Sequence, residues 1–245
     1  MKLSHALVAP VLAACLTMDM TPATATPVTI STLPAWDGTS SIGDFGSAGF
    51  SAWGQFVTAP TGTDRLLDFT FIVSDALQGP APQFRAVPVE FTAHVVQYDP
   101  TTRKIVGPAL YSSPSVTVPL TDALVFHPYT FTPDVQVTAN SVYLMFLYAT
   151  NYTLNVPDDS RLRMASSNSD TYGGGSDNIP FDADSDFSAL FTSQWRFSAG
   201  NDLAFSATFD RTAVPEPGAM ALVIAAALGA AGARRSRGIR RAGPR

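Results

Sequence analysis

The feature that most limits the fold of this chain is the spacing of apolar residues across residues 26–213. No stretch of ten residues in this span repeats apolar side chains with the 3.6-residue period of an amphipathic helix. Candidate strands recur instead every ten to fifteen residues, with Gly, Pro, Asn and Asp between them. Seventeen of the eighteen acidic residues in the span are Asp, which favours turns over helices. The pattern predicts an all-β fold, an antiparallel β-sandwich that is jelly-roll-like.

The strand predicted to lie deepest has no polar face. Residues 142–148 are apolar at seven successive positions, which predicts a central strand that is covered on both sides. We expect this strand to pair with residues 129–137 around a turn at residues 138–141. Residues 89–98 alternate between apolar and polar side chains, so the face that carries His94 is predicted to face water.

Two passages rich in Gly, Ser and Asp interrupt these strands. Residues 36–49 and 167–188 are predicted to be irregular loops, because their composition favours turns. The core is expected to form from the apolar positions of the strands around them. The core residues that we predict are Phe69, Phe71, Val142, Leu144, Phe146, Leu203 and Phe205.

After the predicted sandwich the composition changes sharply. The new segment begins with Val214, Pro215, Glu216 and Pro217. An apolar run of sixteen residues follows at 218–233. As a helix it would cover about 24 Å of a hydrocarbon core about 30 Å thick, so it is a marginal anchor. The basic end begins with Arg234, Arg235 and Arg237 and contains no acid. Such an end stays cytoplasmic, which predicts that the preceding domain faces outward.

This segment resembles the PEP-CTERM sorting signal of Gram-negative bacteria, in its Pro-Glu-Pro motif, its apolar helix and its basic end. In that family an exosortase, a membrane cysteine protease, recognises the signal and is thought to cut near the motif at the cell surface. The resemblance implies an exosortase partner, transient membrane attachment through residues 218–233, and a recognition role for Glu216. The alternative is an ordinary C-terminal anchor that follows a chance Pro-Glu-Pro linker.

The resemblance extends into the preceding domain. Short packing and turn motifs there look like those of a domain common in exported PEP-CTERM proteins, and they carry no known active site. The motifs lie at residues 55–60, 67–71, 107–111, 172–175 and 202–205. They support the predicted fold and leave the function of the domain open.

Residues 1–25 have the pattern of a secretory signal peptide. Lys2 precedes an apolar run at residues 6–16, and small residues end at Ala25, where cleavage is expected. A competing interpretation is that residues 12–15 resemble a lipobox, in which Cys15 would be lipidated. Cys15 is the only cysteine, so cleavage after Ala25 would leave a mature protein without disulfides or thiolate metal sites. The predicted organisation is a signal peptide at 1–25, a sandwich at 26–213 and a sorting signal at 214–245.

The predicted sandwich is strongly acidic. Residues 26–213 contain eight Lys and Arg against eighteen Asp and Glu, a net charge of −10. The whole chain has a charge of only −5, because six of its fifteen basic residues lie in the C-terminal tail. A surface of this charge repels phosphate backbones, so we expect no binding to nucleic acid.

The candidate cofactor is Ca²⁺. Asp182, Asp184 and Asp186 alternate along a loop, and such carboxylates can converge on a hard cation. The loop is not an EF-hand, because Phe187 stands where Gly is needed and Ser193 where Glu is needed. The alternative is a solvated acidic loop, in which case the protein has no cofactor.

Aromatic residues in or beside loops are candidate glycan contacts. Trp36 and Tyr172 have Asp or Asn near them, and a sugar ring can stack its apolar face on such side chains. The alternative reading is that the tryptophans are core residues, which we favour for Trp53 and Trp195 because large aromatics are mostly buried.

The domain shows no catalytic motif in its sequence. His94 and His127 lack a second His or Cys at ligand spacing and are interpreted as structural. The favoured function is therefore a non-catalytic protein of the cell surface or extracellular matrix. Association with exopolysaccharide is implied by the family resemblance alone. The alternatives are a secreted glycan-cleaving enzyme and a lipobox-anchored surface lipoprotein.

Overall fold

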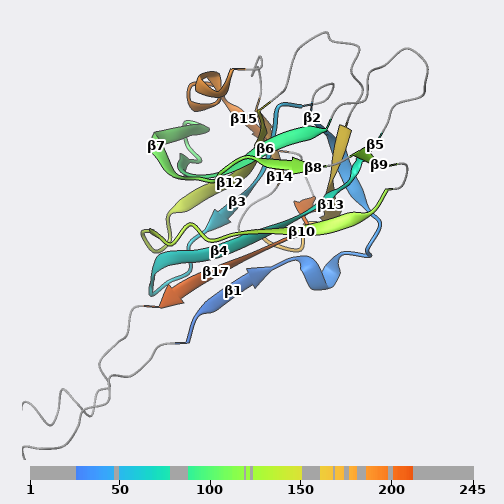
Figure 1. Cartoon of the computed structure of the whole chain (residues 1–245). Coiled ribbons are helices and arrows are strands. Elements are labelled where there is room, and N and C mark those ends of the chain that lie inside the picture. The colour runs from blue at the N-terminus through green and yellow to red at the C-terminus, as the bar shows by residue number, and fades with distance from the viewer. Residues whose placement is uncertain are drawn as a thin grey trace, which may run out of the picture. The chain divides into compact units, whose positions relative to one another are not determined.

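The computed structural model shows an all-β domain, as the sequence predicts (Figure 1). The residues that the structure describes are 26–46, 50–77, 88–118, 120–121, 124–150, 161–167, 169–173, 177–180, 186–197 and 201–211. They belong to one compact unit, Thr26–Thr212. Besides strands, the described residues form two short 3-10 turns, η2 (Leu33–Ala35) and η3 (Phe187–Phe191). Within the described residues, no helical segment has the length and hydropathy that a membrane span requires.

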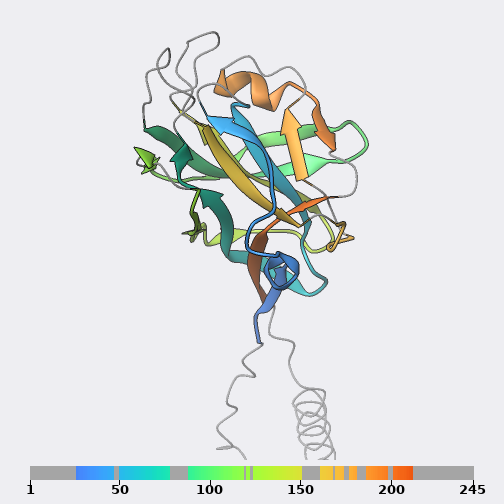
Figure 2. The same ribbon diagram turned by 90° about the vertical axis from the view of Figure 1, so that its right-hand side faces the viewer.

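The described strands form two sheets that pack in a sandwich-like arrangement (Figures 1 and 2). Sheet A runs in the order β1 (Val28–Ser31), β17 (Phe205–Arg211), β4 (Thr63–Ser74), β13 (Arg161–Ser167), β5 (Ala76–Leu77) and β9 (Leu120–Thr121). Beside this path, β10 (Phe126–Phe131) and β11 (Val135–Gln136) pair with β4, while β16 (Asp202–Leu203) and β2 (Ser41–Gly46) pair with β13.

Sheet B is built around the strand that the sequence predicts to be central. Its order is β15 (Trp195–Phe197), β14 (Asp177–Pro180), β3 (Ala52–Thr58), β12 (Val142–Ala149), β6 (Val89–Asp99) and β7 (Lys104–Ser112), with β8 (Val116–Val118) also paired to β6. Among the described strands every pair is antiparallel except β5 with β9. β12 pairs with β3 on one side and β6 on the other, which confirms its predicted place.

The close approach of β3 and β12 explains why a glycine stands at position 54. Gly54 lies opposite Phe146 in the ladder. A Cβ at Gly54 would lie 2.7 Å from the Phe146 Cβ and 2.7 Å from the Met145 carbonyl oxygen, so no larger residue fits without a shift of the backbone.

The main core lies between the sheets and contains most of the predicted core residues. Phe69, Phe71, Phe205 and Phe209 enter it from sheet A, and Phe91 enters it from sheet B. Aromatic rings contact one another across it, as in the Phe91–Tyr129 pair at 5.4 Å between ring centroids. Of the seven predicted core residues, six are buried and Val142 is half-buried.

A second core lies on the opposite, outer face of sheet B. Leu144 and Phe146 point to this face and are fully buried there, because the segment 186–197 packs across it. Trp195 is 1% exposed and its indole N–H donates to the carbonyl oxygen of Leu190 at 3.1 Å.

The face of residues 89–98 that carries His94 was predicted to face water. This prediction is correct for Glu90, which is exposed, and wrong for His94. His94 is only 4% exposed, because η3 covers the strand.

Three local predictions are corrected by pairing between distant strands. Residues 129–137 do not form a hairpin with β12, because β10 and β11 pair with β4 in the other sheet. The turn at 138–141 instead carries the chain from sheet A to sheet B. Two backbone hydrogen bonds hold it beside Ala59, whose carbonyl oxygen accepts the N–H of Asn140 (2.8 Å) and whose N–H donates to the carbonyl oxygen of Ser141 (2.9 Å). The passages predicted to be wholly irregular also contain strands, β2 in the first and β14 in the second.

Both ends of the described domain lie side by side. β1 and β17 pair with Val28 opposite Phe209, and Arg211 lies opposite Thr63 at the start of β4. β4 ends at Ser74, opposite Phe126. Twelve residues of strand cover about 40 Å, so the Ser74 end of β4 is the end of the domain that is distant from both termini (Figure 1).

Candidate functional site

Trp36, a predicted glycan contact, lies on the outer face of sheet A. It follows η2, the blue coil in Figure 2, and is half-buried. Its ring meets Phe126 edge-on at 5.4 Å between centroids, over a small apolar cluster formed by Ile72, Ala165 and Ala204. The indole N–H donates to the carbonyl oxygen of Ser40 at 2.8 Å. The ring is therefore held in one orientation and still reaches the surface.

The loop after Trp36 is fixed by a single carboxylate. Asp37 accepts the backbone N–H groups of Thr39 (2.8 Å) and Ser40 (2.6 Å), and it also accepts the Ser40 hydroxyl. These hydrogen bonds, those from Ser40 first, hold the pKa of Asp37 well below its ordinary value. Gly38 takes the positive φ of +84° that the turn requires. The carboxylate therefore has a structural role in shaping the surface beside Trp36.

Beside Trp36, side chains with hydroxyl groups line up across sheet A. One row crosses four strands, with Ser31 on β1, Ser206 on β17, Thr70 on β4 and Thr130 on β10 directly opposite one another. A second row contains Thr29, Thr208 and Asp68. Neighbouring hydroxyls bond to each other, at 2.8 Å between Thr70 and Thr130 and 3.2 Å between Thr29 and Thr208. We call these two rows the hydroxyl rows.

Tyr172, the other predicted glycan contact, lies on the opposite side of sheet A from Trp36. Its ring packs against the main core and meets Phe205 at 5.8 Å between centroids. Its hydroxyl accepts the backbone N–H of Thr58 at 3.0 Å, and burial raises the pKa of that hydroxyl. The structure therefore does not bring Trp36 and Tyr172 together.

A buried carboxylate that the sequence analysis did not single out ties the two sheets to each other. Asp202 accepts the amide of Gln55 at 2.9 Å and the backbone N–H groups of Thr171 and Tyr172 at 2.8 and 2.6 Å. Gln55 in turn accepts the N–H of Leu203 at 2.9 Å. Burial raises the pKa of Asp202, and these donors act in the opposite direction.

Three of the quoted sequence motifs meet in this network. Gln55, Tyr172 and Asp202 each belong to one of them. Their role is to join β3, β16 and the loop before β14, since every carboxylate oxygen already has a donor within the protein. Local sequence patterns could not have suggested the contact, because Gln55 and Asp202 are 147 residues apart.

Asp186 is the one predicted calcium ligand within the described residues, and it begins η3. Its Oδ1 accepts the N–H of Ser188 and its Oδ2 accepts the Ser188 hydroxyl, both at 2.9 Å. These bonds lower the pKa of Asp186. Asp182 and Asp184 lie outside the described residues. Among the residues that are described, no three His, Cys, Asp or Glu side chains come together as a metal site. The calcium site stays a prediction.

His94 is enclosed by the second core. Its ring stacks on Phe146 at 5.0 Å and meets Phe187 at 4.6 Å. Nε2 lies 2.7 Å from the hydroxyl of Thr92, and Nδ1 lies 2.9 Å from that of Ser112. Burial lowers the pKa of His94 to about 4, so the ring is neutral at pH 7. This agrees with the structural role that the sequence suggests.

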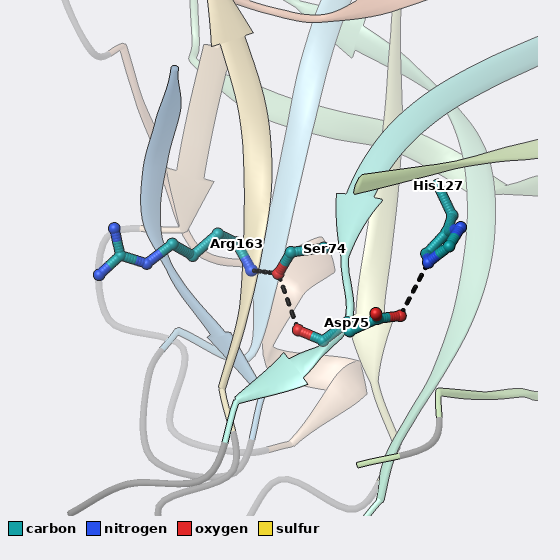
Figure 3. A network of polar contacts seen from close by, with 4 residues as sticks. All are labelled: Ser74, Asp75, His127 and Arg163. Carbon is teal, nitrogen blue, oxygen red and sulfur yellow. Dashed lines mark hydrogen bonds and ion pairs between the residues drawn. The ribbon is translucent and has the colours of Figure 1, made fainter. Parts of the chain in front are cut away.

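His127 has an acidic partner at the end of the domain distant from the termini (Figure 3). Its Nε2 lies 2.9 Å from Oδ1 of Asp75, and the side chains are 47% and 10% exposed. The hydroxyl of Ser74 donates to the Asp75 carbonyl oxygen at 2.9 Å and accepts the N–H of Arg163 at 2.8 Å. The Arg163 side chain points away from the pair (Figure 3). The arrangement ties β4 to β13 and orients one imidazole.

The sorting residues and the N-terminal segment lie outside the described residues. This applies to Cys15, Val214, Pro215, Glu216, Pro217, the run at 218–233, Arg234, Arg235 and Arg237.

Comparisons of the chain with models of known protein families, with curated proteins and with solved structures found no match.

Proposed function

We propose that this chain is an exported, non-catalytic protein of the cell surface or extracellular matrix, sorted by an exosortase and associated with exopolysaccharide. The observation that carries the proposal is the tripartite tail, in which a Pro-Glu-Pro motif precedes an apolar run and a cluster of arginines. Each part has a distinct physical role in sorting, as recognition site, membrane segment and cytoplasmic stop. The signal peptide at residues 1–25 belongs to the same proposal, because a sorting signal acts only on an exported chain.

The geometry of the domain is consistent with display at a surface. Val28 and Phe209 lie opposite each other, so the segments before and after the domain join it at the same end. A domain attached through that end presents its distant end and the outer face of sheet A to the surroundings. The β-sheet hydrogen bonds and the buried Asp202 network stabilise it without a thiol, since the only cysteine is Cys15.

The finer class of the fold is part of the proposal. We infer a jelly-roll-like sandwich, because the described chain crosses repeatedly from one sheet to the other. It crosses between β3 and β4, between β11 and β12, and between β15 and β16. Such crossings are characteristic of Greek-key and jelly-roll sandwiches.

Mass spectrometry of surface material tests the sorting step. We expect a C-terminus close to Pro215, Glu216 and Pro217, and an N-terminus at Thr26. Glu216→Ala should leave the intact chain in the inner membrane. Recovery of mature surface protein that still ends at Arg245 would contradict the proposal. A lipid on Cys15 would instead support the surface-lipoprotein alternative.

A glycan array combined with a reducing-sugar assay tests the role of the domain. The proposal expects binding to at least one polysaccharide without release of reducing ends. The array is needed because the sequence does not specify the sugar. Absence of binding to every glycan would leave a purely structural role and would contradict the association with exopolysaccharide.

One observation favours the alternative of a glycan-cleaving enzyme. A buried carboxylate that orients a half-exposed imidazole, as Asp75 does for His127, is an arrangement used in acid–base catalysis. Release of reducing sugar that is lost in His127→Gln and retained in the buried His94→Gln variant would establish this alternative. Equal release from both variants would exclude a role for the pair.

A further inference from the structure

We propose that the outer face of sheet A, made of the hydroxyl rows and Trp36, is the surface on which a neutral polysaccharide strand binds. This inference rests on the proposed association with exopolysaccharide and assigns it to a site. The face combines two features that sugars require. It has side chains that both donate and accept hydrogen bonds, and at one edge it has an aromatic ring.

The hydroxyl rows have a regular spacing that a repeating polymer can follow. Strands lie about 4.8 Å apart, and side chains two positions apart on one strand are separated by about 6.7 Å. Ser206 and Thr208 lie two positions apart on β17, and Thr29 and Ser31 do so on β1. The rows therefore present a grid of donors and acceptors rather than one isolated group. A polymer with hydroxyls along its length can bond to several of them at once.

The grid is open to solvent at its margins. Thr29, Ser31 and Thr130 are exposed, and Ser206 and Thr208 are half-buried. Thr70, in the middle, is 9% exposed and acts mainly by orienting the Thr130 hydroxyl to which it bonds. A ligand on this face would therefore contact the edge strands and β17 most strongly.

Trp36 borders the row of Ser31, Ser206, Thr70 and Thr130. The next position along β4 after Thr70 on this face is Ile72, which belongs to the cluster beneath Trp36 and Phe126. A sugar that lies on the row can place its apolar face against the indole while its hydroxyls bond to serine and threonine. The fixed orientation of the indole reduces the entropy lost on binding.

Charge selects a neutral ligand. The hydroxyl rows contain no Lys or Arg, and Asp68 is their one charged member. Residues 26–213 have a net charge of −10, so an acidic polysaccharide would be repelled. The rows themselves carry no large apolar side chain, which disfavours a lipid surface or a protein partner that binds by hydrophobic burial.

Retention of the full chain, kept in detergent, on insoluble neutral polysaccharides such as cellulose, chitin and curdlan tests the inference. Thr29→Val with Thr208→Val removes two hydroxyls and keeps the side-chain shape. Each lost hydrogen bond should weaken binding about fivefold, so the double variant should bind about 25-fold more weakly. Trp36→Ala should weaken binding at least tenfold, and Trp36→Phe should restore most of it. Thr117→Val, on an exposed position of β8 in sheet B, is the matched control and should bind like the wild type.

The outcomes separate this inference from the proposed function. If the wild type binds and the sheet A variants bind equally well, the assignment of the face is wrong and the proposed function survives. If the wild type binds no polysaccharide, neutral or acidic, both the assignment of the face and the proposed association with exopolysaccharide fail. Binding to acidic polymers alone would overturn the argument from charge. Concentration-dependent self-association that the double variant abolishes would show that the face binds a second copy of the chain, which would also overturn the inference.

Discussion

The outer faces of the two sheets differ in polarity and in what covers them. On sheet B the outer face is apolar and lies beneath η3 and Trp195, so Phe146 and Leu144 are fully buried on the side away from the main core. On sheet A the outer face carries the hydroxyl rows, and its apolar cluster is confined to the region of Ile72 and Trp36. The centre of sheet B is thus buried on both sides, whereas sheet A is buried mainly on its inner side.

The difference can be traced to two sequence patterns. Residues 142–148 are apolar at every position, so both faces of β12 must be covered. In β17, Phe205, Ala207 and Phe209 alternate with serine, threonine and aspartate, so one face is left to water. Both sheets contribute to the main core, and they differ in their outer faces. The outer face of sheet B adds to stability, whereas that of sheet A is the one that we propose for binding.

The largest loss of stability is expected when a large side chain is removed from the covered outer face of sheet B. Phe146→Ala should lower the free energy of unfolding by about 3–5 kcal/mol, because it leaves a cavity against His94 and Trp195. Denaturant unfolding measures this loss. Thr130→Ala, on the open face, should change it by less than about 0.5 kcal/mol. Equal losses in the two variants would contradict the comparison.

Acid should weaken the covered face selectively. The pKa of His94 is about 4 in the folded protein against an ordinary value of 6.5. Between these values the unfolded chain binds the extra proton, so stability falls as the pH falls from about 6.5 to about 4, by on the order of 3 kcal/mol. Unfolding curves of wild type and His94→Gln across this range isolate the contribution. The difference between the two proteins should shrink towards low pH, and a constant difference would show that His94 does not titrate there.

A smaller effect is expected at the start of the covering segment. Asp186→Ala removes the N-cap of η3, whose carboxylate accepts the N–H and the hydroxyl of Ser188, and should lower the melting temperature by about 3 °C.

The melting temperature also tests the calcium prediction. If Asp182, Asp184 and Asp186 bind Ca²⁺, the ion should raise the melting temperature of the wild type more than that of Asp184→Asn, and Mg²⁺ should not reproduce the difference. Equal responses to both ions would leave only a charged loop.

The smallest effect on stability is expected on the open face. Thr208→Val should leave the free energy of unfolding within about 0.5 kcal/mol of the wild type, because a half-exposed hydroxyl is replaced by a methyl group of similar shape. Thermal unfolding measures this. A loss as large as that of Phe146→Ala would show that the hydroxyl rows hold the fold together and would remove the reason to assign them a binding role.

Features that depend on near neighbours in the chain could be predicted from the sequence. Alternation in residues 203–209 placed Phe205 in the core, and the apolar run at 142–148 identified the central strand. The turn after β6 also depends on near neighbours, because Asp99 shapes it by accepting the N–H of Thr101 and the hydroxyl of Thr102. These features follow from a two-residue period and from turn chemistry, both of which lie within a few positions of the chain.

The contacts between distant segments could be learned only from the folded structure. The sequence did not show that residues 126–136 pair with β4 or that η3 covers His94, because strand pairing and coverage join positions far apart in the chain. The same limit applies to the candidate sites. Trp36 and Tyr172 were both recognisable as aromatics beside loops, and only the fold placed one on the open face and the other against the core. The period of a strand shows which face is apolar, and the packing of the whole chain decides what covers that face.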